Sequence, residues 1–127
     1  MKIKGKVINF NDTFNAEIDF EDNIKAVNKI DEKMENIIIP GYVDLHCHGG
    51  NGYEVMHGWE AITKMSEYHL CHGTTSIAPT TWTETFAKTQ KALEGYNEEI
   101  HNFPNIIGIH LEGPFINPGK LGAHPPK

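Results

Sequence analysis

From Tyr42 onward the sequence alternates short apolar runs with longer amphipathic stretches, and this pattern restricts the possible fold more than any other feature. Three apolar runs have the length and composition of buried strands: Tyr42–His48, Thr74–Pro79 and Asn105–Leu111. Two stretches with apolar residues at helical spacing lie between them: Trp59–His72 and Thr83–Asn102. We expect Gly73 to end the first helix and Thr83 to cap the second. Strands that alternate with helices of this size predict parallel βαβ units, and hence an α/β fold.

The first thirty residues follow a different pattern, in which charged and apolar residues roughly alternate. Such alternation is typical of antiparallel strands that are exposed on one face. Turns rich in Asn and Asp separate three predicted strands: Ile3–Asn9, Ala16–Glu21 and Ile24–Ile30. A polar bridge, Asp31–Asn36, follows before the composition changes. We therefore divide the chain into a small β-domain over residues 1–38 and an α/β region over residues 39–127.

Composition excludes several classes of protein. The 127 residues have the length of one ordinary domain, and 39% of them are hydrophobic, which is enough for a core. A formal charge of −6 argues against a nucleic-acid surface. No stretch approaches the roughly 20 apolar residues that a membrane-spanning helix needs, and the amino terminus does not resemble a signal peptide. Two cysteines make no disulfide framework. We expect a cytoplasmic protein that binds neither nucleic acid nor membrane.

Two short polar islands carry the candidate chemistry. His46 and His48 are separated by one residue, so both imidazoles leave the same face of an extended strand. Glu112 ends the third apolar run and is followed directly by Gly113 and Pro114. Two imidazoles and a carboxylate suit a divalent ion such as zinc or iron. The histidine spacing alone is equally compatible with two polar residues that merely end a strand.

The sequence around these islands resembles a known group of enzymes. PGYVDLHCHGG, residues 40–50, is similar to the first metal motif of the amidohydrolase superfamily. GIHLEGPF at 108–115, GAHPP at 122–126 and GTTSIAPT at 73–80 resemble the N-acetylglucosamine-6-phosphate deacetylases. The resemblance implies the first strands and helices of a (β/α)8 TIM-type barrel, preceded by part of a small β-sandwich domain. The barrel would be incomplete in this chain.

The same resemblance implies roles for individual residues. Glu112 matches a metal ligand, and His46 and His48 match ligands of a further metal in members that keep the pair, so one or two ions are implied. Ala123 and His124 match the pair that contacts the amino sugar. His110, two residues before Glu112, is expected to line the pocket or to orient a ligand rather than to bind metal itself. The family's catalytic aspartate follows the eighth barrel strand, beyond residue 127, so no catalytic residue is assigned here.

Other polar residues near these motifs have simpler interpretations. We expect Asp44 to serve as a hydrogen-bond partner rather than a base, and Cys47 to be a reduced, buried small residue on the opposite face of its strand. Thr80 and Thr81 either line the pocket or form an ordinary turn. The remaining histidines are expected to be surface or packing residues: His57, His69, His72 and His101.

The implied reaction is hydrolysis of the acetamide of N-acetylglucosamine 6-phosphate to glucosamine 6-phosphate and acetate. Because a (β/α)8 barrel usually takes about 250 residues, we expect this chain to be an amino-terminal fragment that is inactive alone, and the complete enzyme to be a homodimer. Two alternatives remain open: another amidohydrolase that acts on a different acylated amine, and a non-catalytic truncated module.

Overall fold

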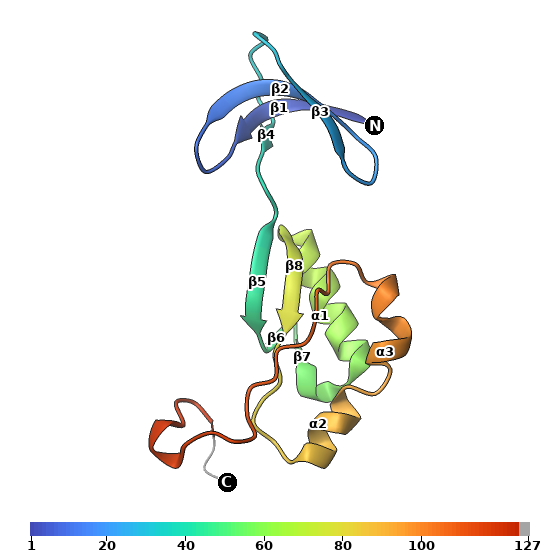
Figure 1. Cartoon of the computed structure of the whole chain (residues 1–127), viewed down its shortest axis with the longest axis vertical. Helices are drawn as coiled ribbons and strands as arrows, with labels where there is room; N and C mark the ends of the chain where they lie inside the picture. The colour runs from blue at the N-terminus through green and yellow to red at the C-terminus, as the bar shows by residue number, and fades with distance from the viewer. Residues whose placement is uncertain (125–127) are drawn as a thin grey trace. The chain divides into compact units, whose positions relative to one another are not determined.

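A computed structural model describes residues 1–124 and divides the chain into two compact units, Met1–Pro40 and Gly41–Lys127. The two units are drawn together in Figure 1 and are described separately below. No helix within residues 1–124 is long and apolar enough to cross a membrane.

The first unit is a four-stranded sheet with the order β3-β2-β1-β4. Its strands are β1 (Lys2–Ile8), β2 (Thr13–Phe20), β3 (Ile24–Lys29) and β4 (Ile37–Ile38). The first three pair antiparallel, as the alternating pattern predicts, and β4 adds a short parallel edge to β1. Ala16 and Ile18 are buried on one face of β2, whereas most other side chains of this sheet are at least partly exposed. The predicted strands are confirmed to within a few residues at their ends.

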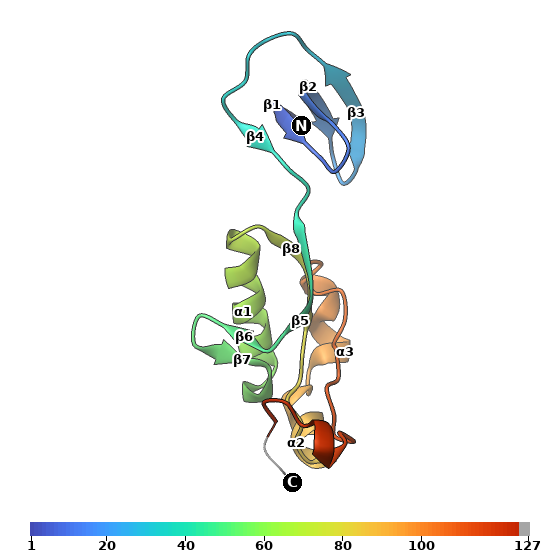
Figure 2. The same ribbon diagram turned by 90° about the vertical axis from the view of Figure 1, so that its left-hand side faces the viewer.

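The second unit begins with the expected strand–helix–strand unit. β5 (Tyr42–Cys47) and β8 (Thr74–Pro79) pair in parallel, and α1 (Trp59–Cys71) connects them and packs against β8. Figure 2 shows this strand pair nearly edge-on, with α1 along one side. A small hairpin of β6 (Gly49–Gly50) and β7 (Tyr53–Glu54), followed by η1 (Val55–His57), fills the connection. Gly73 ends the helix at φ 94°, as predicted.

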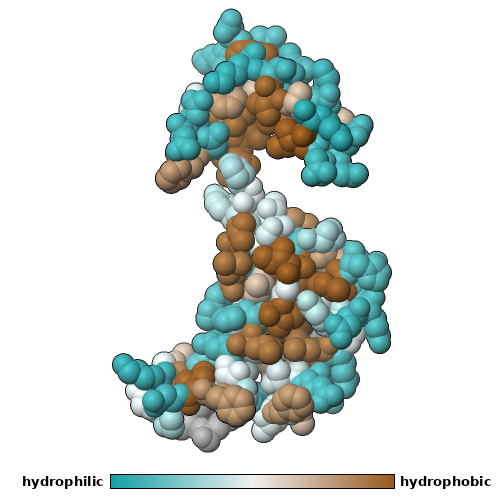
Figure 3. Space-filling view, viewed as in Figure 1, coloured by the Kyte–Doolittle hydropathy of each residue, from teal (hydrophilic) through white to brown (hydrophobic). Residues whose placement is uncertain are grey.

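One hydrophobic cluster holds this unit together. It joins α1 to β8 and to the following segments through six buried side chains: Val55, Trp59, Ile62, Met65, Ile77 and Ile106. The exposed face of β5 carries Val43 and Leu45, which are 61% and 62% exposed. Figure 3 shows hydrophobic side chains gathered over this part of the unit. The α/β class predicted from the sequence is confirmed, while the sheets of the described residues are mixed and do not close into a barrel.

The predicted strand Asn105–Leu111 does not form a continuous strand. It follows β8 in parallel through two isolated bridges, Ile77 with Ile106 and Thr80 with His110. Between the first bridge and the second, the β8 segment advances by three residues whereas the later segment advances by four. The later segment therefore has one extra residue between Ile106 and His110, which interrupts the ladder in the manner of a β-bulge.

The predicted helix Thr83–Asn102 is wrong in its extent. The structure has α2 (Phe86–Ala92), α3 (Tyr96–Glu99) and the 3-10 turn η2 (Ile100–Asn102) instead. Gly95 adopts φ 92° and ψ −16°, a left-handed conformation that separates α2 from α3. The cap is also displaced, because the side chain of Thr85, and not that of Thr83, accepts a hydrogen bond from the Lys88 amide. A last 3-10 turn, η3, spans Pro118–Lys120.

Candidate metal centre

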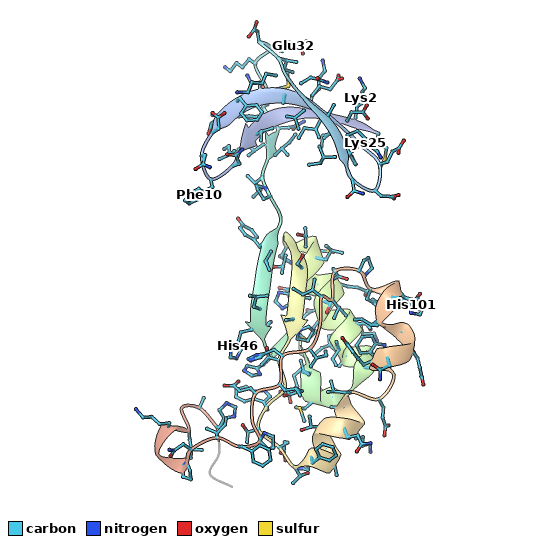
Figure 4. All side chains as sticks on the ribbon, in the orientation of Figure 1. Lys2, Phe10, Lys25, Glu32, His46 and His101 are labelled. Carbon is cyan, nitrogen blue, oxygen red and sulfur yellow. The ribbon has the colours of Figure 1, made fainter. Side chains whose placement is uncertain are left out.

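The two polar motifs come together because the segments that carry them both pair with β8, one on each side of it. β5 pairs with one edge of β8, and the segment around His110 pairs with the other. Since all three run in parallel, their carboxyl ends meet at one edge, where α/β folds commonly place their sites. His46 ends up at the carboxyl end of β5, as Figure 4 shows. Glu112 arrives two residues after the His110 bridge.

Three side-chain atoms form a nearly equilateral triangle at this edge. His46 Nε2 lies 3.2 Å from His48 Nε2, and each of these nitrogens lies 3.1 Å from Glu112 Oε2. Neighbouring ligands on a tetrahedral zinc ion are about 3.3 Å apart, given metal–ligand bonds of about 2.0–2.1 Å. His46, His48 and Glu112 therefore have both the chemistry and the spacing of a divalent metal site.

Backbone contacts orient the His48 imidazole. Its Nδ1 lies 3.0 Å from the carbonyl oxygen of Thr80, which can only accept a hydrogen bond. Nδ1 therefore carries the proton, and the lone pair of the neutral ring is on Nε2, the atom that faces Glu112. A backbone carbonyl on the remote nitrogen is a common way of fixing the tautomer of a metal-binding histidine.

Glu112 is held at its backbone amide and at its Oε1 atom. Its amide donates to Thr81 Oγ1 at 3.2 Å, and His124 Nε2 lies 3.0 Å from its Oε1. The hydrogen bond from His124, and then the charges of His124 and His46, hold the pKa of the Glu112 carboxyl below its usual 4.5. Gly113 follows at φ 83°, and the close approach of Thr83 leaves no room there for a side chain. The carboxylate thus stays ionised, as a metal ligand must.

The expected substrate-contacting residues border the same cavity. His124 is buried, and within residues 1–124 its Nδ1 has no hydrogen-bond partner. Ala123 is exposed beside it. A cavity of about 440 Å³ lies here, lined by both of these residues together with the three members of the triangle. Its volume is within the range of small-molecule sites.

His110 lies beside the triangle without belonging to it. Its ring centroid is 4.9 Å from that of His46, while its Nδ1 donates to Thr80 Oγ1 at 3.3 Å. Asp44 accepts a hydrogen bond from the His46 amide at 3.1 Å, as predicted. Cys47 is half-buried and its thiol donates to the Gly49 carbonyl. Burial raises the pKa of this thiol.

The remaining histidines lie outside the triangle, as expected. His57, His72 and His101 are exposed. His69 on α1 is half-buried, and its Nε2 lies 3.1 Å from the carbonyl oxygen of Gly49.

Three consecutive residues after β8 contribute more than the sequence interpretation gave them. Thr80 and Thr81 are fully buried, and their hydroxyls accept hydrogen bonds from the Cys47 and Glu112 amides. Trp82, which the sequence interpretation overlooked, stacks on His48 with ring centroids 3.9 Å apart. The available signal was its position shortly after β8, a strand whose carboxyl end lies at the same sheet edge as His46 and His48.

Comparison with known proteins gives consistent matches. A model of the amidohydrolase family matches residues 37–125. An N-acetylglucosamine-6-phosphate deacetylase of Bacillus subtilis is 33% identical in an alignment of 104 residues, and the match covers 76% of this chain and 26% of the relative. An N-acetylgalactosamine-6-phosphate deacetylase of Shewanella is 36% identical in an alignment of 92 residues, and the match covers 70% of this chain and 23% of the relative.

A solved structure extends the match to nearly the whole chain. The crystal structure of an N-acetylglucosamine-6-phosphate deacetylase from Thermotoga maritima aligns with a TM-score of 0.87 at 28% identity, over 98% of this chain and 35% of that one. The chain thus spans about a quarter of the length of these curated relatives and about a third of the Thermotoga protein.

Proposed function

Since this chain belongs to the amidohydrolase family, we propose that it supplies part of the active site of an N-acetylglucosamine-6-phosphate deacetylase. The reaction is hydrolysis of the acetamide to glucosamine 6-phosphate and acetate. The observation that carries this proposal is the triangle of His46, His48 and Glu112, in which two imidazole nitrogens and one carboxylate oxygen lie 3.1–3.2 Å apart.

The donor set suits zinc or iron, and one or two ions could be held. His46, His48 and Glu112 would hold the ion at the carboxyl edge of the sheet. A divalent ion bound there supplies Lewis-acid activation of an amide carbonyl and of a water molecule. Glu112 is ready for this role because its lowered pKa keeps it ionised. His48 is ready because the Thr80 carbonyl keeps its Nδ1 protonated and its Nε2 free to bind.

The remaining roles in the proposal fall on residues around the cavity. His124 and Ala123 would contact the amino sugar, and the unpartnered Nδ1 of buried His124 is available to a sugar hydroxyl or acetamide group. His110 would orient the site through Thr80. Hydrolysis also needs a base that takes the proton of the attacking water and passes it to the leaving amine. We assign that base to no residue of this chain.

The proposal includes the domain organisation. Residues 1–38 would be part of a small β-sandwich domain, and residues 39–127 the first strands and helices of a (β/α)8 barrel. The parallel arrangement of β5, β8 and the segment around His110 supports a barrel, because barrel strands are parallel and place their ligands at their carboxyl ends. A cytoplasmic location and a homodimeric complete enzyme stay predictions.

Two alternatives differ in substrate. The Shewanella relative acts, by its name, on N-acetylgalactosamine 6-phosphate, so the epimeric sugar is the first competitor. A different acylated amine is the second. A non-catalytic metal-binding module is the remaining alternative.

The test is acetate release by the protein that contains this chain, measured with the two 6-phosphorylated amino sugars and with unphosphorylated N-acetylglucosamine. We expect N-acetylglucosamine 6-phosphate to be the preferred substrate, with activity lost on chelation and restored by added Zn²⁺ or Fe²⁺. Glu112→Gln keeps the size of the side chain but removes its charge, and it should lower both bound metal and activity.

The controls separate these possibilities. Glu98→Gln changes an exposed glutamate on α3, away from the triangle, and should leave metal content and activity unchanged. Equal rates with the phosphorylated and the unphosphorylated sugar would contradict the proposed preference for the 6-phosphate group. Acetate release that survives complete metal removal would contradict the proposed metal centre.

A further inference from the structure

Trp82 touches two histidines of the candidate site from one position. Its ring lies nearly parallel to the His48 imidazole, with centroids 3.9 Å apart and an interplanar angle of 15°. It also meets the His124 ring edge-on, with centroids 5.2 Å apart and an angle of 66°. Stacked and edge-on arrangements are the favoured geometries of aromatic pairs.

The same two histidines face the two carboxylate oxygens of Glu112. His48 Nε2 lies 3.1 Å from Oε2, and His124 Nε2 lies 3.0 Å from Oε1. Trp82, His48, Glu112 and His124 therefore form a closed ring of four side chains. Displacing any one of them removes a contact from both of its neighbours.

We propose that Trp82 is a positioning residue that fixes the His48 ring for metal binding, with His124 in edge-on contact with the indole. This inference rests on the proposed metal site. Two constraints act on His48: the Thr80 carbonyl holds Nδ1 in the ring plane, and the indole covers one ring face. Together they leave one orientation, in which Nε2 faces Glu112.

The two candidate histidine ligands differ in the way that this role requires. The His48 side chain is 23% exposed, whereas that of His46 is 52% exposed. Side chains that must be ordered when a ligand binds lower its affinity, so a ring already held in place favours binding. His48 and Glu112 thus form the preorganised part of the triangle, and Trp82 is what shields His48.

Substitution of Trp82 should leave the fold intact. The hydrophobic cluster of the second unit is built from Val55, Trp59, Ile62, Met65, Ile77 and Ile106, and Trp82 is outside it. Trp82 is itself half-buried rather than part of a fully buried core. Trp82→Leu removes the stacking surface but keeps an apolar side chain, and Trp82→Phe keeps an aromatic face. Phe86→Leu serves as a matched control, because Phe86 is 77% exposed on α2.

The first experiment measures Zn²⁺ affinity of the full chain by competition with a chromophoric chelator. We expect Trp82→Leu to weaken Zn²⁺ binding about 10-fold, the lower end of the range for residues that orient metal ligands. Trp82→Phe should recover most of this loss, and Phe86→Leu should have no effect. In a His48→Ala background, Trp82→Leu should cause no further loss, whereas in a His46→Ala background the 10-fold loss should persist.

A second measurement needs no metal. In the zinc-free chain, the ring current of the indole should shift the His48 ring-carbon protons upfield in the NMR spectrum, and this shift should disappear in Trp82→Leu. Unchanged Zn²⁺ affinity in Trp82→Leu, or an equal loss in the His48→Ala background, would overturn the positioning role while leaving the metal site intact. Failure of the unsubstituted chain to bind Zn²⁺ would overturn the proposed function and this inference together.

Discussion

Thr80 offers the sharpest test of how the metal-site segments are held together. Its buried hydroxyl accepts a hydrogen bond from the Cys47 amide at 3.0 Å and from the His110 ring at 3.3 Å, and it donates to the Ala78 carbonyl at 3.2 Å. Thr80→Val replaces the hydroxyl by a methyl group of similar size. The Cys47 amide then loses its acceptor at the point where β5 delivers its two histidines.

The magnitude follows from burial. A buried amide left without a partner costs about 1–3 kcal/mol. The exposed His110 ring can exchange its hydrogen bond for one to water, so its loss adds little. We therefore expect the free energy of unfolding to fall by about 1–3 kcal/mol. Zn²⁺ affinity should fall about 10-fold or more, because Cys47 lies between the two histidine ligands.

Equilibrium unfolding in urea, followed by circular dichroism, measures the first quantity, and chelator competition measures the second. Thr63→Val is the matched control. Thr63 is also buried, but its hydroxyl donates to the Glu60 carbonyl within α1, which already belongs to the helical hydrogen-bond ladder. Since no amide is left without a partner, its loss should cost no more than the net value of one hydrogen bond, about 0.5–1.5 kcal/mol. Equal destabilisation by the two substitutions, with Zn²⁺ affinity unchanged in both, would refute the reasoning.

Three further predictions concern single groups. Iodoacetamide should alkylate exposed Cys71 well before Cys47, whose thiol pKa is raised by burial; faster modification of Cys47 would contradict this. In metal-free protein the Glu112 pKa, measured by NMR, should lie below 4.5 and should rise in His124→Gln. Because the pKa is lower in the folded state than in the unfolded state, ionised Glu112 stabilises the fold at pH values above the unfolded-state pKa, and this contribution is lost as the pH falls through the folded-state pKa. Ile62→Ala, in the core, should cost about 2–5 kcal/mol in urea unfolding, and a loss below 1 kcal/mol would show that the core is misassigned.

The spacing of apolar residues was sufficient to predict the strands and the helix of the first βαβ unit. β5, α1 and β8 lie where the apolar spacing placed them, and the amidohydrolase family indicated by the HCH motif is confirmed. The pattern failed where one residue breaks it. Gly95 divides the second helix although apolar residues continue at helical spacing beyond it, and Gly108 lies where the third strand loses its register. The left-handed backbone conformation of Gly95 separates the two helices, and hydrophobic spacing does not encode it.

The site was only partly predictable for a related reason. The βαβ pattern brings His46, His48 and Glu112 to one edge, because parallel neighbours align their carboxyl ends. The approach of His124 to Glu112 depends on the path of an irregular loop after residue 112, which no periodicity describes. The family resemblance indicated a role for His124, whereas its contact with Glu112 required the three-dimensional structure.

The residues that determine the geometry of the site differ from those that identify the family. The ligand motifs lie on β5 and on the segment around His110, which occupy opposite edges of β8. Hydrogen bonds from both motifs meet at the end of β8: His48 Nδ1 binds the Thr80 carbonyl, and the Glu112 amide binds Thr81 Oγ1. Since β8 lies between the two ligand segments, the residues directly after it, Thr80 and Thr81, are able to contact both segments at once. These residues do not ionise near neutral pH, so a search for titratable groups overlooks them although the spacing of the ligands depends on them.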